Sequence, residues 1–138
     1  MFAVTKIISF CYGHRLLNYQ GKCKVLHGHN GAAEIALEAK RLDRRGMVID
    51  FGDVKNVVGA FIDRKLDHRM LLCKEDPIVP ILKKMGEPYF LMDENPTAEN
   101  IAKLIYDFAL KKNLPVVSVK LWETSTSFAI YRGEKKGG

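Results

Sequence analysis

The stretch AAEIALEAK (residues 32–40), followed after a charged turn by DFGDVKNVVGAFIDRKL (residues 50–66), decides the fold class. In the first segment aliphatic residues on one face alternate with glutamates on the other, which is typical of a half-buried strand. In the second segment the spacing becomes helical, and it predicts one long amphipathic helix. Its apolar stripe consists of Val54, Val57, Val58, Phe61 and Ile62.

The same patterns extend to both sides of this stretch. They predict a β-rich start at Met1–Phe10, a second helix beginning near Thr97, and strands at Val116–Glu123 and Ser127–Arg132. The segment Arg69–Asn95 is interrupted by three prolines and predicts irregular structure with one short helix around residues 78–85. The resulting order predicts an α+β fold, in which two helices cover one face of a four-stranded antiparallel sheet. Because the sheet edges stay uncovered, we expect self-association.

Length and composition limit the classes of protein. The 138 residues fit one domain, for which we predict residues 1–132, with a flexible tail at residues 133–138. No apolar run is long enough to cross a membrane, and the N-terminus resembles a strand more than a signal peptide. The three cysteines form no disulfide framework, which favours a cytoplasmic location. The net charge of +6 permits an anionic partner without selecting one.

The four histidines carry the strongest chemical signal. His27 and His29 are two residues apart, so in a strand they project from the same face. With His14 from a neighbouring strand they predict a metal site of three imidazoles, which is typical of catalytic zinc with an open fourth position. The alternative is that His27 and His29 only form hydrogen bonds in a loop, but Gly28 between them favours close approach of a ligand.

Cys23 lies four residues before His27 and has two interpretations. As a fourth zinc ligand it would close the site and make it structural. As a free thiol beside a cation it would act as a base or nucleophile. Cys11 and Cys73 lack such neighbours and are expected to be packing residues.

Two further groups are candidates. Asp67 directly precedes His68, and in such a pair the carboxylate can orient the imidazole for proton transfer. The simpler interpretation is that the two residues only end a helix. Glu123 and Thr124 end a strand, and a carboxylate there can accept paired N–H groups from a flat heterocycle, although a surface glutamate is the simpler interpretation.

Five motifs in register resemble the family of 6-pyruvoyltetrahydropterin and 6-carboxytetrahydropterin synthases over nearly the whole chain. They are Phe-x-x-x-His at Phe10–His14, Cys-x-x-x-His-Gly-His at Cys23–His29, Leu-Asp-His at Leu66–His68, Pro-Thr-x-Glu-Asn at Pro96–Asn100 and Glu-Thr at Glu123–Thr124.

The resemblance implies the tunnelling fold, whose sheets join in an oligomeric barrel, usually a homohexamer of two trimers with active sites between subunits. It implies zinc as cofactor and a lyase acting on 7,8-dihydroneopterin triphosphate. The implied site consists of zinc ligands His14, His27 and His29, catalytic Cys23, Asp67 and His68, and pterin-binding Glu123 with Thr124 and Thr97. Basic residues near the mouth, Arg15, Lys22 and Lys24, are candidates for the triphosphate.

The spacing of Cys23 and His27 is similar to that of the carboxytetrahydropterin branch, which serves queuosine biosynthesis. The expected product is therefore 6-carboxy-5,6,7,8-tetrahydropterin, formed with loss of triphosphate and acetaldehyde; a 6-pyruvoyltetrahydropterin synthase is the alternative. The chain departs from the family pattern at Cys11, Tyr12 and Gly31, so the shape of the pocket is expected to differ.

A non-catalytic metal- or anion-binding module is the competing class. It would require a closed Cys–His zinc site and basic residues gathered on one face. Lysine and arginine are scattered along the chain instead, so we expect neither a nucleic-acid partner nor a membrane partner.

Overall fold

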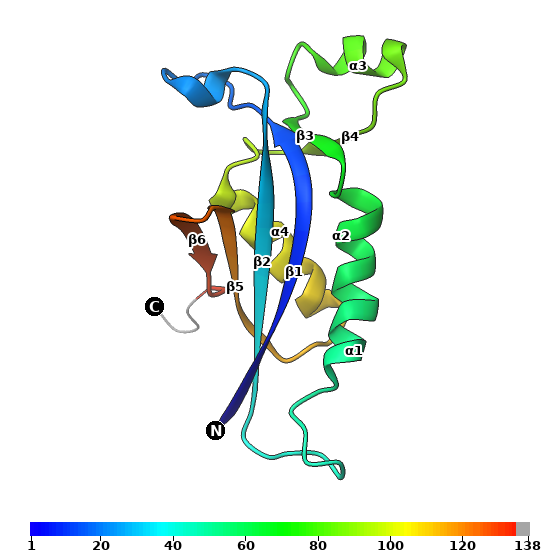
Figure 1. Ribbon diagram of the computed structural model, residues 1–138, viewed down its shortest axis with the longest axis vertical. Coiled ribbons are helices and arrows are strands. Elements are labelled where there is room, and N and C mark those ends of the chain that lie inside the picture. The colour runs from blue at the N-terminus through cyan, green and yellow to red at the C-terminus, as the bar shows by residue number, and fades with distance from the viewer. Residues whose placement is uncertain (135–138) are drawn as a thin grey trace.

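The computed structural model describes residues 1–134 and consists of one six-stranded sheet with helices packed on one face (Figure 1). The strands are β1 (Phe2–His14), β2 (His27–Ala39), β3 (Arg69–Cys73), β4 (Tyr89–Met92), β5 (Val116–Thr124) and β6 (Ser127–Tyr131). Their order across the sheet is β4-β3-β1-β2-β5-β6. The predicted tail at residues 133–138 lies mostly outside the described residues.

The long hairpin of β1 and β2 is the centre of the sheet. Its antiparallel register runs from Phe2 opposite Ala39 to His14 opposite His27, so both strands are longer than the sequence predicts. Alternate residues of β2, among them Ile35 and Leu37, are fully buried, as the alternation of the sequence requires. The register brings the histidine-bearing ends of the two strands together at one end of the sheet.

Two helical segments cover the buried face. The first, predicted over residues 50–66, comprises α1 (Phe51–Val54), a π-helical turn labelled η2 (Lys55–Gly59) and α2 (Ala60–Lys65). The second is α4 (Ala98–Lys111), and Thr97 caps it by accepting a hydrogen bond from the amide of Asn100. Both helices predicted from the apolar stripes are therefore confirmed.

The predicted four-stranded antiparallel sheet was wrong in strand number and direction, although the α+β class is confirmed. β3 pairs parallel with the end of β1, and β4 pairs parallel with β3. These strands are five and four residues long and flank the short helix α3 (Val79–Met85), which the sequence did predict. Such short strands carry no periodic pattern, and pairing with β1 creates them.

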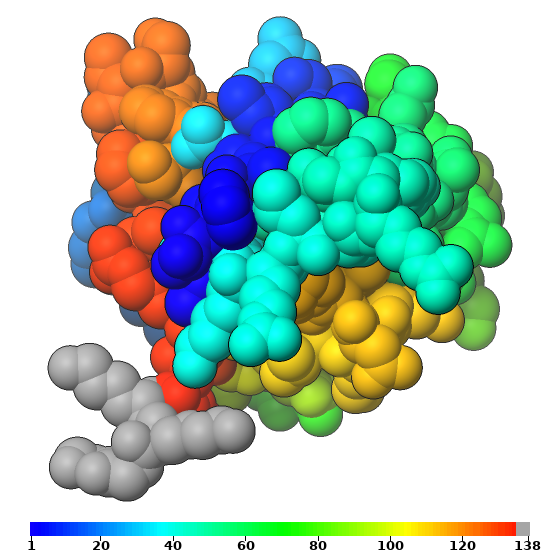
Figure 2. All heavy atoms as spheres, turned by 90° about the horizontal axis from the view of Figure 1, so that it is seen from below, coloured from blue at the N-terminus to red at the C-terminus, as the bar shows by residue number. Residues whose placement is uncertain are grey.

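One edge of β1 is open over most of its length. β3 pairs with residues Tyr12–His14, so within residues 1–134 the stretch 2–11 has no strand partner on that side. Figure 2 shows this N-terminal strand in blue, between the turquoise segment that leads into α1 and the orange-red C-terminal strands. A groove of about 500 Å³ follows the open edge and is lined by residues of β1, η2 and α2, with Asp67 among them. β6 is the opposite edge of the sheet.

No helix within residues 1–134 has the length and apolar character that a membrane span needs.

Candidate metal centre and catalytic groups

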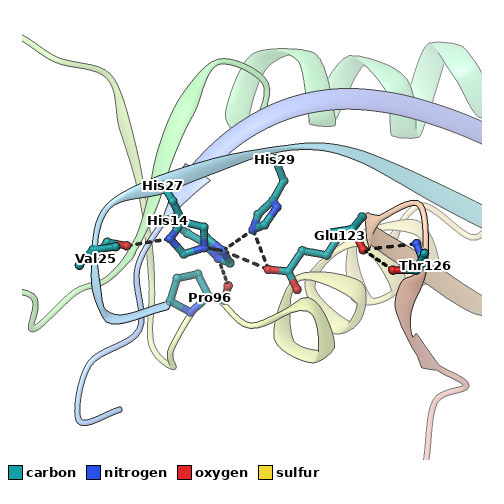
Figure 3. A network of polar contacts seen from close by, with 8 residues as sticks. His14, Val25, His27, His29, Pro96, Glu123 and Thr126 are labelled. Atoms are coloured by element: carbon teal, nitrogen blue, oxygen red, sulfur yellow. Dashed lines mark hydrogen bonds and ion pairs between the residues drawn. The ribbon is translucent and has the colours of Figure 1, made fainter. Parts of the chain in front are cut away.

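The three histidines predicted as metal ligands lie together at the end of the β1–β2 hairpin (Figure 3). His14 is the last residue of β1, and His27 is the first residue of β2. The Nε2 atom of His14 is 3.0 Å from Nε2 of His27 and 3.1 Å from Nε2 of His29. Three imidazole nitrogens therefore converge on one point.

Backbone carbonyls hold two of these rings. Nδ1 of His14 lies 2.7 Å from the carbonyl oxygen of Pro96, and Nδ1 of His27 lies 2.7 Å from that of Val25. A carbonyl can only accept, so each Nδ1 carries the proton and leaves its Nε2 free as a lone-pair donor. Carbonyl contacts of this kind orient the histidine ligands of metal sites.

Glu123 completes the cluster, which the sequence analysis did not anticipate. Its Oε1 atom is 2.9 Å from Nε2 of His29 and 3.1 Å from Nε2 of His14. Glu123 belongs to β5, which pairs with β2, so its side chain and those of the histidines share the buried face. The alternation of residues in β5 indicates which face of the sheet Glu123 occupies, but its distance from the histidines depends on the register of β5 against β2.

The four side chains fit a metal ion. Their ligand atoms all lie within 4.8 Å of one another. Ligands about 2.05 Å from a tetrahedral zinc ion would be separated by about 3.3 Å, slightly more than the four contacts of 2.9 to 3.1 Å. Three imidazoles and a carboxylate are also a donor set that zinc accepts.

The electrostatics favour a neutral His29 and a charged Glu123. Burial lowers the pKa of His29, and this effect outweighs the negative charge of Glu123, which acts to raise the same pKa. The contact with His14 lowers the pKa of Glu123 by more than burial raises it. Both shifts favour the forms that bind a divalent cation, which are a neutral imidazole at His29 and a carboxylate at Glu123.

Tyr12 and Gly31 lie against each other beside the cluster. A Cβ atom on Gly31 would lie 2.9 Å from Cε1 of Tyr12, so the glycine makes room for the ring. The ring of Tyr12 meets that of His14 edge-on, with 5.3 Å between centroids. Its hydroxyl is buried and has no hydrogen-bond partner among the described residues. Burial, and then the charge of Glu123, raise the pKa of Tyr12, so the hydroxyl stays protonated.

The structure places Cys23 outside the metal cluster. The residue lies in η1 (Lys22–Lys24), a short turn between β1 and β2, and its thiol is not one of the grouped ligand atoms. Its backbone carbonyl accepts a hydrogen bond from the amide of Leu16. This position favours the free thiol over the fourth ligand.

Asp67 and His68 form the predicted pair at the junction of α2 and β3. Oδ2 of Asp67 is 2.8 Å from Nδ1 of His68, while its Oδ1 accepts a hydrogen bond from the amide of Cys11. Burial acts to raise the pKa of Asp67, but the bonds from Cys11 and His68 bring it below its ordinary value. The side chain of His68 is 78% exposed. Within the described chain the pair shares no hydrogen bond or ion pair with the metal cluster or with Cys23.

The threonines and basic residues make mostly structural contacts in the isolated chain. Thr97 caps α4, and Oγ1 of Thr124 contacts Oγ1 of Thr126 at 3.3 Å. Arg15 is held by Asp76 in a bidentate ion pair, which reduces its freedom to meet a triphosphate. Lys22 and Lys24 are exposed on either side of Cys23.

Sequence reasoning did not anticipate that Glu99 lies in a cavity with Glu123. Glu99 and Glu123 line one cavity of about 440 Å³ between the start of α4 and β6. The sequence analysis gave Glu99 no role, although it belongs to the Pro-Thr-x-Glu-Asn motif. Only the packing of α4 against β5 and β6 brings the two carboxylates to the same cavity.

Comparison with known proteins identifies the family. Residues 3–134 match the family model described as 6-pyruvoyl tetrahydropterin synthase. The chain belongs to this family. A 6-carboxy-5,6,7,8-tetrahydropterin synthase of Rickettsia typhi is 38% identical over 135 residues, covering 93% of this chain and 98% of the relative.

Solved structures agree. The 6-pyruvoyl tetrahydropterin synthase of Caenorhabditis elegans superposes with a TM-score of 0.70 at 25% identity, covering 96% of both chains. An uncharacterized protein from Wolinella succinogenes reaches a TM-score of 0.79 at 27% identity, covering 96% of this chain and 98% of the other. The fold is therefore the predicted tunnelling fold, and the protein is a lyase acting on pterins.

Proposed function

We propose that the protein converts 7,8-dihydroneopterin triphosphate and one water molecule to 6-carboxy-5,6,7,8-tetrahydropterin, triphosphate and acetaldehyde, and that it requires zinc. The observation that carries the proposal is the convergence of three imidazole Nε2 atoms beside a carboxylate and a cavity. The 38% identity with a relative named for the 6-carboxy product supports the product.

His14, His27 and His29 would hold the zinc ion, with Glu123 at its edge. When bound, zinc supplies a Lewis acid for side-chain oxygens of the substrate and stabilises negative charge that develops there. The carbonyls of Pro96 and Val25 keep two of the rings in the required tautomer.

The cavity beside the cluster suits the pterin ring. The amino-pyrimidinone edge of a pterin offers neighbouring N–H donors, which a carboxylate accepts in pairs. Glu99 and Glu123 are the two carboxylates of this cavity. We assign the ring to it and keep Glu123 as an acceptor, with Glu99 as a second one and with Thr97 and Thr124 as auxiliary contacts.

Proton transfer would use Cys23 and the Asp67–His68 pair at different stages. The thiolate of Cys23 would remove a proton from the substrate's side chain, and His68 would return one elsewhere. Asp67 orients His68 through Nδ1, which leaves Nε2 to face a ligand.

The separation of these groups within one chain supports an assembly in which a neighbour completes the site. Asp67 lines the groove along the open edge of β1, and β6 is an edge strand of the sheet. Free edges invite pairing with another chain. We therefore propose a closed ring of subunits, with a hexamer of two trimers as the expected assembly in the cytoplasm.

The alternative product, 6-pyruvoyltetrahydropterin, is favoured by the family description and by the likeness to the nematode enzyme. Mass spectrometry of the products separates the two. Incubation of the zinc-loaded protein with 7,8-dihydroneopterin triphosphate should yield the 6-carboxy compound and acetaldehyde in equal amounts. A 6-pyruvoyl product without acetaldehyde would select the alternative, and unchanged substrate would reject both.

A further inference from the structure

The segment between two of the metal-binding histidines is a long connection that carries Cys23. It spans residues 15–26, and its own described backbone bonds are few, such as the one between the amide of Leu16 and the carbonyl of Cys23 at 2.9 Å. Several of its side chains, including Tyr19, Val25 and Leu26, are more than 40% exposed. A loop of this kind needs anchors on the body of the protein to hold a thiol in a fixed place.

Asn95 provides such an anchor. Its Oδ1 accepts a hydrogen bond from the amide of Leu17 at 2.9 Å, and its Nδ2 donates one to the carbonyl of the same residue, also at 2.9 Å. The side-chain amide thus pairs with both backbone groups of one loop residue, as a neighbouring strand would. Only an asparagine-like amide offers this donor and acceptor together at this length.

Asn95 is itself held in place. Its backbone carbonyl accepts hydrogen bonds from Nδ2 of Asn100 at 2.9 Å and from the amide of Thr97 at 2.8 Å. Asn100 lies in the first turn of α4, where its amide also meets the capping oxygen of Thr97. The rigid start of the helix therefore determines where the side chain of Asn95 points.

The same turn also holds a metal ligand. Pro96, the residue after Asn95, accepts the hydrogen bond from Nδ1 of His14 at 2.7 Å. One short segment thus contacts both the ring of His14 and the loop that begins directly after it. Residues 95–100 therefore fix the position of the loop and the orientation of the His14 ring together.

We infer that Asn95, locked by Asn100, is a positioning residue that sets the place of the Cys23 thiol relative to the metal cluster. This inference rests on the proposed role of Cys23 as the base. Asn95 touches neither the ligand atoms nor the thiol in the described structure, so its effect is exerted through the backbone of Leu17.

The test uses Asn95→Ala and Asn95→Asp, with Glu94→Ala as the matched control on the neighbouring exposed residue. The aspartate variant keeps the acceptor for the Leu17 amide and places an oxygen against the Leu17 carbonyl. Both Asn95 variants should retain one zinc ion per chain. Turnover per bound zinc, measured well below the melting temperature, should fall about 10- to 100-fold, the range found when the outer contacts of a site are removed. The KM should change less than threefold, and the control should match the wild type.

A second readout does not depend on activity. Amide exchange at Leu17 and the rate of Cys23 alkylation by iodoacetamide, mapped by mass spectrometry, should both rise at least about tenfold in the variants, since the loop opens locally. Cys11, which lies within the β1–β2 ladder, serves as the internal reference. Asn100→Ala should give a smaller change in the same direction.

The outcomes distinguish a failure of the role inferred for Asn95 from a failure of the proposed function. Unchanged turnover per zinc with a lower melting temperature would make Asn95 merely structural and overturn the inference. Unchanged exchange and alkylation would overturn it as well. If the wild-type protein leaves the pterin substrate unchanged but the exchange and alkylation rates rise as expected, the proposed function fails while the anchoring of the loop by Asn95 stands.

Discussion

Two inactive variants should restore each other's activity when they are assembled together. Cys23→Ala removes the proposed base, and His68→Ala removes the proposed acid. Each alone should lower turnover about 10²- to 10⁴-fold, the usual weight of general acid–base catalysis. In the described chain the two residues share no hydrogen bond, and Asp67, the partner of His68, lines the groove along the open edge of β1. We therefore expect each site to take Cys23 from one subunit and His68 from its neighbour.

The size of the recovery follows from counting subunits. In a mixed ring with equal amounts of both variants, half of the subunits carry an intact Cys23 and half carry an intact His68. If assembly is random, about one site in four combines both intact groups, so turnover per chain should reach about a quarter of the wild-type value. This is at least about 25-fold above either variant alone, even when each loses only about 10²-fold.

The assay requires co-expression of the two variants with different affinity tags, tandem purification and measurement of turnover per zinc. A mixture of Asp67→Asn with His68→Ala is the matched control, because every chain then carries a damaged pair and no site recovers. Mixed assemblies whose turnover equals the average of the two variants would refute the shared site and would place both groups in one chain.

Other predictions follow from single contacts. Tyr12→Phe removes a buried hydroxyl that has no hydrogen-bond partner among the described residues. The free energy of unfolding, measured by chemical denaturation, should therefore stay constant or rise by about 1 kcal/mol. A decrease of that size would show that the hydroxyl does form a hydrogen bond. Gly31→Ala should lower the free energy of unfolding by about 1–3 kcal/mol, because its Cβ would meet the Tyr12 ring at 2.9 Å. This loss should be smaller in a Tyr12→Ala background, and additive losses would show that the two residues do not interact. The hydrogen bond from Arg15 lowers the pKa of Asp76 below its value in the unfolded chain. The stability that Asp76 contributes is therefore complete above about pH 5 and is lost as the pH falls through the folded pKa. Asp76→Asn should flatten this decline in acid unfolding curves, and an unchanged decline would show that other groups cause it.

The sequence alone was sufficient to place the three histidines together and to find both long helices. His27 and His29 are two residues apart, and a strand needs no further information to place them on one face. The helix over residues 50–66 follows from its apolar stripe, yet the π-helical turn at Lys55–Gly59 does not, because a local change in helical pitch leaves the sequence pattern nearly intact.

The remaining features depend on contacts between distant segments. β3 and β4 exist because they pair beside the end of β1, so composition near the prolines gives no sign of them. Glu123 reaches the histidines only through the register of β5 against β2. The role of Asn95 requires its contact with Leu17, 78 residues earlier in the chain. The roles of all the predicted site residues stay predictions: metal ligands His14, His27 and His29, catalytic Cys23, Asp67 and His68, and pterin-binding Glu123, Thr124 and Thr97.

A titration of metal-free protein with zinc, with bound metal and turnover of 7,8-dihydroneopterin triphosphate measured in the same samples, tests the central claim most directly. Three histidines that converge on one point predict that both quantities rise together and level off at about one zinc ion per chain. His29→Ala should shift both curves to higher zinc concentration. Full turnover in protein without metal, or zinc binding that leaves turnover unchanged, would contradict the account.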